Sequence, residues 1–128
     1  MTKEEYNFIA NQIVDACYQV HHELGPGLLE SAYEYALLKE FELRNIRAAN
    51  QVQTKLFYKG YDTGKYYQID ILVENEIVIE IKCCEIMHPV YTAQVISYLK
   101  LSQKKLGFLV NFHVPVIKEG IKRFVNKF

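Results

Sequence analysis

The segment IVIEIK, residues 77–82, places two charged side chains inside an otherwise apolar stretch. Side chains alternate across a strand, so Glu80 and Lys82 share one face with Val78, and the isoleucines share the other. A strand this apolar is expected to be central and covered on both faces, where an isolated charge is very costly. The segment therefore predicts either a functional pair of charges or a Glu–Lys ion pair on a solvated edge strand.

The strand before it contributes a second carboxylate, Asp70. If residues 74–76 form a three-residue hairpin loop, Val73 pairs with Ile77 and Asp70 faces Glu80 on the same side of the sheet. Two adjacent carboxylates repel each other unless a cation or a proton lies between them. A two-residue loop would instead put Asp70 on the opposite face, so this expectation depends on the loop.

A divalent metal ion would resolve the repulsion between Asp70 and Glu80. Mg²⁺ takes oxygen ligands, usually one or two carboxylates together with waters and a substrate phosphate. We expect the Ile81 carbonyl oxygen to be a further ligand, and Lys82 to hold the attacking water or stabilise charge on the phosphate. The spacing Asp-x9-Glu-x-Lys alone also occurs by chance in many strands.

Two predicted helices add candidate site residues. Glu30 follows a Gly-Pro-Gly break, in the first turn of a helix, with Tyr33 and Glu34 on the same side at i+3 and i+4. A favourable interaction with the helix N-terminus would also explain Glu30. Gln94 and Tyr98, at i and i+4 of a later helix, could reach one ligand or one phosphate, or could be the polar fringe of a core-facing stripe.

Hydrophobic periodicity predicts the elements that position these residues, in the order α-α-β-β-β-α-β. The expected helices begin near Thr2, Leu28 and Pro89, and the expected strands are Gln51–Tyr58, Tyr66–Val73, Ile77–Cys83 and Leu106–Phe112. The tail, residues 116–128, fits either an edge strand or a short helix. This order predicts an α/β fold with a mixed central sheet covered by helices, formed by residues 1–128 as a single domain.

Composition limits the class of protein. Half of the residues are apolar and 13% are aromatic, which excludes a disordered chain. There is no apolar stretch of the roughly 20 residues that a membrane span needs, and no signal-peptide pattern. The three cysteines form no Cys-x-x-Cys pair and are expected to be free, buried thiols. We therefore expect a cytoplasmic protein with no membrane partner.

The net charge is zero, but the charges are unevenly spread along the chain. Residues 1–80 carry seven Lys and Arg against 13 Asp and Glu, whereas residues 81–128 carry eight against two. A salt-bridged surface would account for this. Alternatively, the carboxylates gather around a cation while basic residues meet phosphates, the candidates being Lys100, Lys104, Lys105, Lys118, Lys122, Arg123 and Lys127.

The segment Gly27-Leu28-Leu29-Glu30-Ser31-Ala32-Tyr33 resembles the signature of the GxxExxY proteins, a group within the PD-(D/E)XK nuclease superfamily. The resemblance extends from VHHELGPGLLESAYEYAL through QIDILVENEIVIEIK to NFHVPVIKEGIKR. It implies a restriction-endonuclease-like core and a nuclease that uses Mg²⁺ or Mn²⁺.

Carried over residue by residue, the resemblance makes Glu30 the helical carboxylate near the metal. Asp70 becomes the aspartate of the second strand, and Glu80 with Lys82 the Glu-x-Lys pair of the third. Gln94 and Tyr98 look like the Gln-x-x-x-Tyr motif of the exonuclease-like branch of the superfamily.

Three hypotheses follow. The leading one is a Mg²⁺- or Mn²⁺-dependent phosphodiesterase acting on DNA, with sequence preference supplied by a homodimer, a protein partner or a fused protein. The second is a catalytically silent nuclease-fold module that binds nucleic acid or a protein partner. The third is a structural or assembly protein whose ten tyrosines line an interface.

Overall fold

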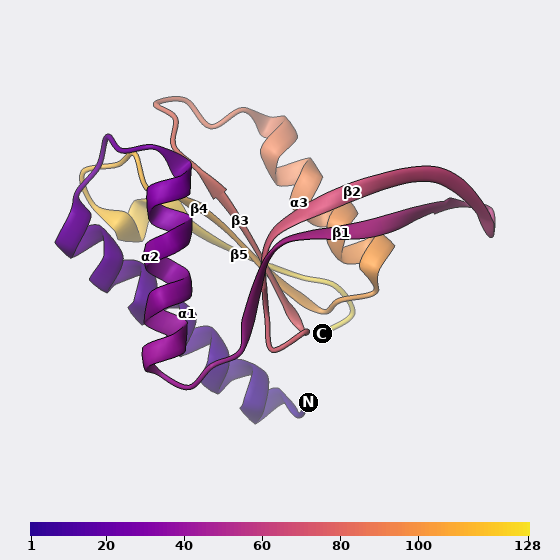
Figure 1. Cartoon of the computed structure of the whole chain (residues 1–128), viewed down its shortest axis with the longest axis horizontal. Coiled ribbons are helices and arrows are strands. Elements are labelled where there is room, and N and C mark those ends of the chain that lie inside the picture. The colour runs from indigo at the N-terminus through magenta and orange to yellow at the C-terminus, as the bar shows by residue number, and fades with distance from the viewer.

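The structure, a computed structural model, describes residues 1–128 as three helices, a short 3₁₀ helix and a five-stranded sheet (Figure 1). In chain order the elements are α1 (Lys3–Leu24), α2 (Glu30–Leu43), β1 (Ala48–Tyr58), β2 (Tyr61–Val73), β3 (Ile77–Lys82), α3 (Pro89–Ser102), β4 (Leu106–Asn111), η1 (Ile117–Gly120) and β5 (Ile121–Val125). The predicted order of elements is confirmed. The ambiguous tail contains both alternatives, a 3₁₀ turn followed by an edge strand.

The sheet is mixed, as predicted, with the strand order β1-β2-β3-β4-β5. β3 and β4 are parallel, and every other neighbouring pair is antiparallel. Parallel neighbours need a crossover connection, which α3 provides. β3 is the central strand, where its apolar sequence predicted it to be, so its side chains are covered from both faces.

The two faces of the sheet are covered by different helices. On one face, here called the two-helix face, α1 and α2 pack over a cluster of 20 buried residues (Figure 1). On the other face, here called the α3 face, a single helix packs over six buried residues. Val78 belongs to this smaller cluster. Alternation along β3 therefore places the next two even-numbered residues, Glu80 and Lys82, on the α3 face.

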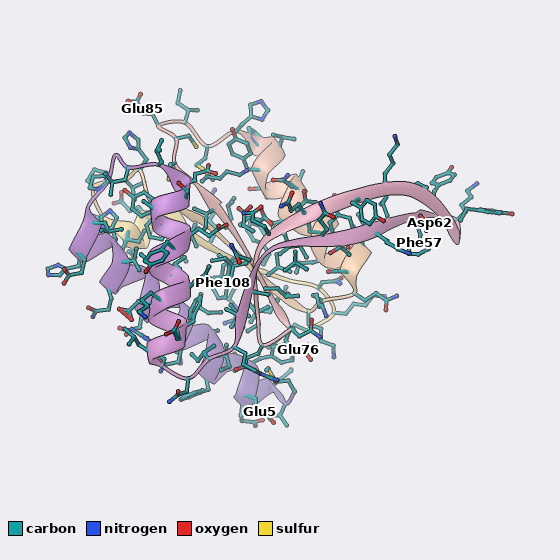
Figure 2. All side chains as sticks on the ribbon, in the orientation of Figure 1. Glu5, Phe57, Asp62, Glu76, Glu85 and Phe108 are labelled. Atoms are coloured by element: carbon teal, nitrogen blue, oxygen red, sulfur yellow. The ribbon has the colours of Figure 1, made fainter.

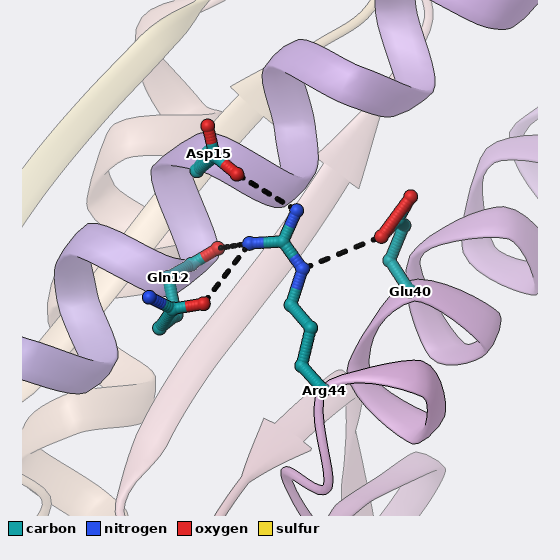
Figure 3. Close-up of polar contacts among 4 residues, drawn as sticks. All are labelled: Gln12, Asp15, Glu40 and Arg44. Atoms are coloured by element: carbon teal, nitrogen blue, oxygen red, sulfur yellow. Dashed lines mark hydrogen bonds and ion pairs between the residues drawn. The ribbon is translucent and has the colours of Figure 1, made fainter.

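Arg44, at the C-terminal end of α2, ties the two helices of the two-helix face together (Figure 3). Its guanidinium lies 2.8 Å from a carboxylate oxygen of Asp15 in α1 and 3.3 Å from one of Glu40 in α2. It also donates to the backbone carbonyl of Gln12 at 3.2 Å. The Arg44 side chain is only 17% exposed, so these partners compensate for its desolvation.

The β1–β2 hairpin is longer than predicted. β2 begins at Tyr61, so the expected strand start at Tyr66 was wrong. Asp62 accepts a hydrogen bond from the Gly64 N–H, a turn-like contact that the strand accommodates beside a register shift in β1. The outer end of the hairpin projects away from the rest of the molecule (Figure 1).

Candidate active site

The loop between β2 and β3 sets the register of the candidate site. Val73 pairs with Ile77, so residues 74–76 form the three-residue loop on which the sequence argument depended. Glu74 and Asn75 both adopt left-handed conformations, with φ of 52° and 54°, which a loop this short requires. The predicted register of β2 against β3 is therefore confirmed, and it places Asp70 beside Glu80.

Asp70 and Glu80 meet where β2 separates from β3. Cα pairing between the two strands extends from Val73 only as far as Ile71, the residue next to Asp70. Side chains replace the missing ladder: the Asp70 N–H donates to Glu80 Oε1 at 3.2 Å, and the Ile81 N–H donates to Asp70 Oδ2 at 2.9 Å. The two carboxylates thus cross-link the diverging strands.

The pairing of β2 with its other neighbour, β1, is also interrupted beside Asp70. Asn50 and Val52 of β1 both pair with β2, but Gln51 between them has a left-handed φ of 50° and no Cα partner. The backbone is consequently released around Asp70 on both sides. Such local departures from strand geometry often accompany functional sites.

Glu80 is a buried carboxyl group, only 2% exposed, with no positively charged side chain in ion-pair contact. Burial, followed by the negative charge of Asp70, raises the pKa of Glu80 to about 9. Lys82 opposes this rise, but more weakly. In the protein without ligands, a proton on Glu80 therefore relieves the repulsion between the two carboxylates at neutral pH.

A cleft of about 260 Å³ opens in front of Asp70 and the backbone of Ile81. Glu30, the first residue of α2, lines the same cleft, as the helical carboxylate was expected to do. Glu34 lies one helical turn further on and also lines it. There it accepts hydrogen bonds from Gln51, at 2.5 Å, and from a neighbouring β1 amide. Gln51 and Glu34 were not among the predicted site residues, although the i, i+4 spacing from Glu30 to Glu34 pointed to the second.

Tyr33 does not share this side of the helix, contrary to the sequence argument. It is fully buried, and its ring stacks on Phe112 with centroids 4.4 Å apart. Its hydroxyl donates to the Gly25 carbonyl at 2.5 Å and accepts from the Leu28 N–H at 3.2 Å. Tyr33 therefore fixes the loop that leads into α2, and thereby the position of Glu30.

Helix α3 contributes three polar side chains to the α3 face, those of Tyr91, Gln94 and Tyr98. Lys82 places its Nζ 4.6 Å from the centroid of the Tyr91 ring, a cation–π contact that the sequence argument missed. Gln94 donates to the Tyr98 hydroxyl at 3.1 Å, as their i, i+4 spacing allows. Burial raises the pKa of Tyr98, and the charges of Asp70 and Glu80 add to that rise. The hydroxyl group of Tyr98 is therefore close enough to the two carboxylates for their negative charge to affect its pKa.

Gln94 has an unusual feature: its Oε1 atom is buried and has no hydrogen-bond partner. The Tyr67 hydroxyl, on β2, is in the same state, and its ring lies 4.9 Å from that of Tyr98. Buried polar groups without partners are rare in folded proteins. Both atoms lie on the α3 face, beside the site.

The residues present fit an open divalent-metal site. No three His, Cys, Asp or Glu side chains converge tightly enough to hold an ion among themselves. Mg²⁺ does not need such a cage, because one or two carboxylates with water and substrate phosphate suffice. Asp70 and Ile81 line the cleft, whereas Glu80 and Lys82 do not. Glu80 is buried directly beside Asp70 and could supply the second carboxylate. None of the lysines offered for phosphate contacts lines it.

Comparisons with known proteins support the same family. No curated protein and no solved structure matches the chain. None of its helices combines the length and apolarity needed to cross a membrane. A family model described as the PD-(D/E)XK nuclease superfamily matches residues 7–124, which include every candidate site residue named above. The chain therefore belongs to the PD-(D/E)XK nuclease superfamily.

Proposed function

We propose that residues 1–128 form one domain that acts as a Mg²⁺- or Mn²⁺-dependent phosphodiesterase on DNA. The observation that carries the proposal is the meeting of Asp70 and Glu80 where β2 leaves β3, each accepting a backbone N–H from the other strand. Lys82 follows on the same face, and Glu30 lines the cleft beside Asp70. A buried carboxyl beside a second carboxyl has little structural value, but it suits a cation.

Asp70 and Glu80 would hold the ion together with the Ile81 carbonyl, and Glu30 would complete the site from α2. The bound ion would supply Lewis-acid polarisation of the phosphate and a more acidic water. Glu80 must give up its proton to become a ligand, since only the ionised carboxylate binds a metal well. Burial and, next, the negative charge of Asp70 hold this proton in the free protein, and a bound cation would offset both.

Lys82 would stabilise the negative charge that develops on the phosphate. The Tyr91 ring 4.6 Å from its Nζ orients the ammonium group without neutralising it. Gln94 and Tyr98 would position the nucleic-acid strand. The unpartnered Gln94 Oε1 supports this role, because it is an acceptor with no hydrogen bond to break, and a strand would reach this buried atom by displacing the groups that cover it.

The deciding experiment is Mn²⁺-dependent cleavage of single- and double-stranded DNA by the wild type and Lys82→Ala, with RNA as a parallel substrate. We expect cleavage by the wild type and a loss of about 10²–10³-fold in turnover for Lys82→Ala, with Mn²⁺ affinity largely kept. Lys39→Ala, an exposed lysine on α2, is the matched control and should cleave normally. Absence of both Mn²⁺ uptake and cleavage in the wild type would overturn the proposal.

A catalytically silent nuclease-fold module that binds nucleic acid or a protein is the second candidate. It is favoured by two observations: no three metal-binding side chains converge, and both central carboxylates are engaged with backbone N–H groups. Calorimetric titration of the pure protein with Mn²⁺ separates the two candidates. Uptake of one ion that is lost in Asp70→Asn supports the enzyme, and no uptake supports the binding module.

A further inference from the structure

The outer end of the β1–β2 hairpin, residues 55–66 and here called the aromatic arm, exposes large aromatic side chains. Phe57, Tyr58, Tyr61 and Tyr66 are 53%, 66%, 77% and 57% exposed, and every residue from 57 to 62 is exposed. Figure 2 shows Phe57 and Asp62 far from the body of the molecule. Scattered exposed aromatics need no explanation, but a contiguous group of this kind marks an interaction surface.

Lysines are interleaved with these aromatic residues. Lys55, Lys59 and Lys65 lie on the arm against one acidic residue, Asp62, whereas the whole chain has no net charge. The Lys55 ammonium lies 3.8 Å from the Asp62 carboxylate, and Lys59 lies over the Tyr58 ring at 5.6 Å. The arm therefore combines flat apolar surfaces with a local positive charge.

The arm is continuous with the candidate active site. Tyr67 follows it directly on β2, and its ring lies 4.9 Å from that of Tyr98. Three residues further along the same strand is Asp70. Tyr58 and Tyr61 pair across the hairpin on the same face as Tyr67, whereas Tyr66 lies on the other face. A ligand lying along this face would pass from Tyr58 and Tyr61 over Tyr67 and Tyr98 to the carboxylates.

We propose that the aromatic arm binds single-stranded nucleic acid, stacking unpaired bases on Tyr58 and Tyr61, which pair across the hairpin, and leading the strand along the same face towards Asp70 and Glu80. The proposal rests on the proposed nuclease function for its direction towards the cleft. Proteins that hold single strands without reading sequence combine stacking aromatics with a positive track for the phosphates, and the arm has both. A duplex keeps its base faces stacked and so offers nothing to the tyrosines. The site should accordingly prefer single strands or unpaired ends.

Charge argues against a second copy of the chain as the occupant. Two arms pairing with each other would bring like charges together, which disfavours association. A polyanion with exposed ring faces complements both features of the arm at once.

The test measures binding without cleavage, in EDTA, by fluorescence anisotropy of a labelled oligothymidylate of about 16 nucleotides and of a duplex of equal length. We expect tighter binding to the single strand. Tyr58→Ala/Tyr61→Ala should weaken it by about tenfold to a hundredfold and leave duplex binding unchanged. Tyr58→Trp/Tyr61→Trp should restore binding, whereas Tyr58→Leu/Tyr61→Leu should not, because leucine lacks a ring face.

Tyr35→Ala is the matched control, because Tyr35 is 71% exposed on α2, away from the arm. It should bind the single strand as the wild type does. A second variant, Lys55→Gln/Lys59→Gln/Lys65→Gln, should reduce the slope of log K against log salt by about two for a single strand. Circular dichroism melts of each variant check that the fold is kept.

Unchanged single-strand binding in the tyrosine variant, or tighter binding to duplex than to single strand, overturns the proposal. So does arm-dependent binding to anionic lipid vesicles with no effect on the oligonucleotide, which would assign the arm to a membrane surface. Cleavage by the wild type with an arm that does not matter rejects the arm and keeps the nuclease. Arm-dependent binding with neither Mn²⁺ uptake nor cleavage rejects the nuclease and keeps the arm as a single-strand binding site.

Discussion

The two faces of the central sheet solve different problems. The two-helix face buries 20 residues in one apolar cluster, closed by α1 and α2. The α3 face buries six, and beyond them the sheet carries Glu80, Lys82 and the polar side of α3. The difference is that most of the apolar burial lies on the two-helix face, whereas the α3 face carries the buried carboxyl group of Glu80. The candidate site itself lies at the border of the two, because its cleft is lined by Glu30 and Glu34 of α2. One face supplies most of the apolar burial, and the other tolerates groups that burial disfavours.

The buried polar groups make this division clear. Asn111, at the end of β4, is 3% exposed and fully bonded: it donates to the Cys84 carbonyl and accepts from the Cys84 and His113 N–H groups. Glu80, equally buried, has a pKa raised to about 9, and Gln94 keeps an oxygen without a partner. A buried polar group that serves structure is satisfied within the protein. Glu80 lacks a positively charged partner and Gln94 Oε1 lacks any hydrogen bond, so neither group is compensated as Asn111 is.

The largest expected effect comes from a matched pair of truncations, Leu37→Ala and Leu99→Ala, which tests whether the two faces contribute differently to stability. Both leucines are buried, Leu37 in the cluster of the two-helix face and Leu99 in that of the α3 face. We expect losses of about 4–5 kcal/mol for Leu37→Ala and about 2–3 kcal/mol for Leu99→Ala. A cavity enclosed by two helices and the sheet relaxes little, whereas one covered by a single helix can collapse further.

Urea unfolding of both variants measures the two losses, and Tyr35→Ala on the exposed side of α2 should change stability by less than about 0.5 kcal/mol. Equal losses at the two leucines would show that both faces contribute alike, and the division would then be only chemical.

The next effect concerns Glu80 and pH. Its pKa is raised from 4.5 in an ordinary setting to about 9, so between these values the folded protein holds a proton that the unfolded chain has lost. The contribution of this group to the free energy of unfolding is therefore at its maximum below pH 4.5 and decreases as the pH rises towards 9. Glu80→Gln removes the penalty, and we expect it to stabilise the metal-free protein at pH 8 by at least about 1.4 kcal/mol.

Thermal melts of wild type and Glu80→Gln from pH 5 to pH 9 check this sign. The difference in stability should grow steadily with pH. A difference that is constant or shrinks would show that the Glu80 carboxylate is compensated in the free protein, and the contrast with Asn111 would disappear.

Asp70→Asn should have a smaller effect in the same direction. The change keeps an oxygen to accept the Ile81 N–H but removes the charge that is the second cause of the raised pKa of Glu80. We expect the metal-free protein to gain about 0.5–1 kcal/mol at pH 8, while Mn²⁺ binding by calorimetry falls sharply. A strongly destabilised variant in a protein that gains nothing from metal would make Asp70 structural.

The sequence predicted those parts of the fold that local patterns determine. Helical periodicity, the capping box of Thr2 and Glu5, and the three-residue loop before Ile77 all follow from neighbouring residues, and the structure confirms them. The start of β2 did not follow, because Asp62 and Gly64 have the chemistry of a turn. Pairing of Asp62 with Phe57 of β1 nevertheless places this segment in the strand, while Gly64 keeps a left-handed φ of 71° at the register shift.

The candidate site was predicted where it lies on paired strands and missed where it depends on distant packing. Nothing in a glutamine indicates the left-handed φ of Gln51, which the interrupted pairing beside Asp70 accommodates. Tyr33 was placed beside Glu30 by helical spacing, but its ring is drawn into the core by Phe112, far along the chain. Helical spacing shows which residues share a face of a helix, but the residues that pack against the helix determine which face is buried.

The smallest expected effect on stability separates a ligand-binding role from a structural one at Gln94. Gln94→Met keeps the length of the side chain and removes its amide group. In the wild type, the amide Nε2 donates to the Tyr98 hydroxyl, and Oε1 has no hydrogen-bond partner. The lost hydrogen bond costs about 1 kcal/mol, and the removal of a buried unpartnered acceptor returns a similar amount. We therefore expect unfolding free energies within about 1 kcal/mol of the wild type.

Cleavage and single-strand binding should nevertheless fall in Gln94→Met, with the Mn²⁺ affinity of the carboxylates unchanged, because Gln94 is assigned to the strand and not to the ion. Gln94→Glu provides the contrast: it keeps an acceptor but adds a third negative charge on the α3 face, and should raise the pKa of Glu80 further and weaken binding of the phosphate backbone. Comparison of melts, Mn²⁺ titrations and oligonucleotide anisotropy for the two variants isolates the amide. A large loss of stability in Gln94→Met, with binding retained, would place Gln94 among the structural residues and leave the α3 face with the carboxylates and Lys82 as its only functional groups.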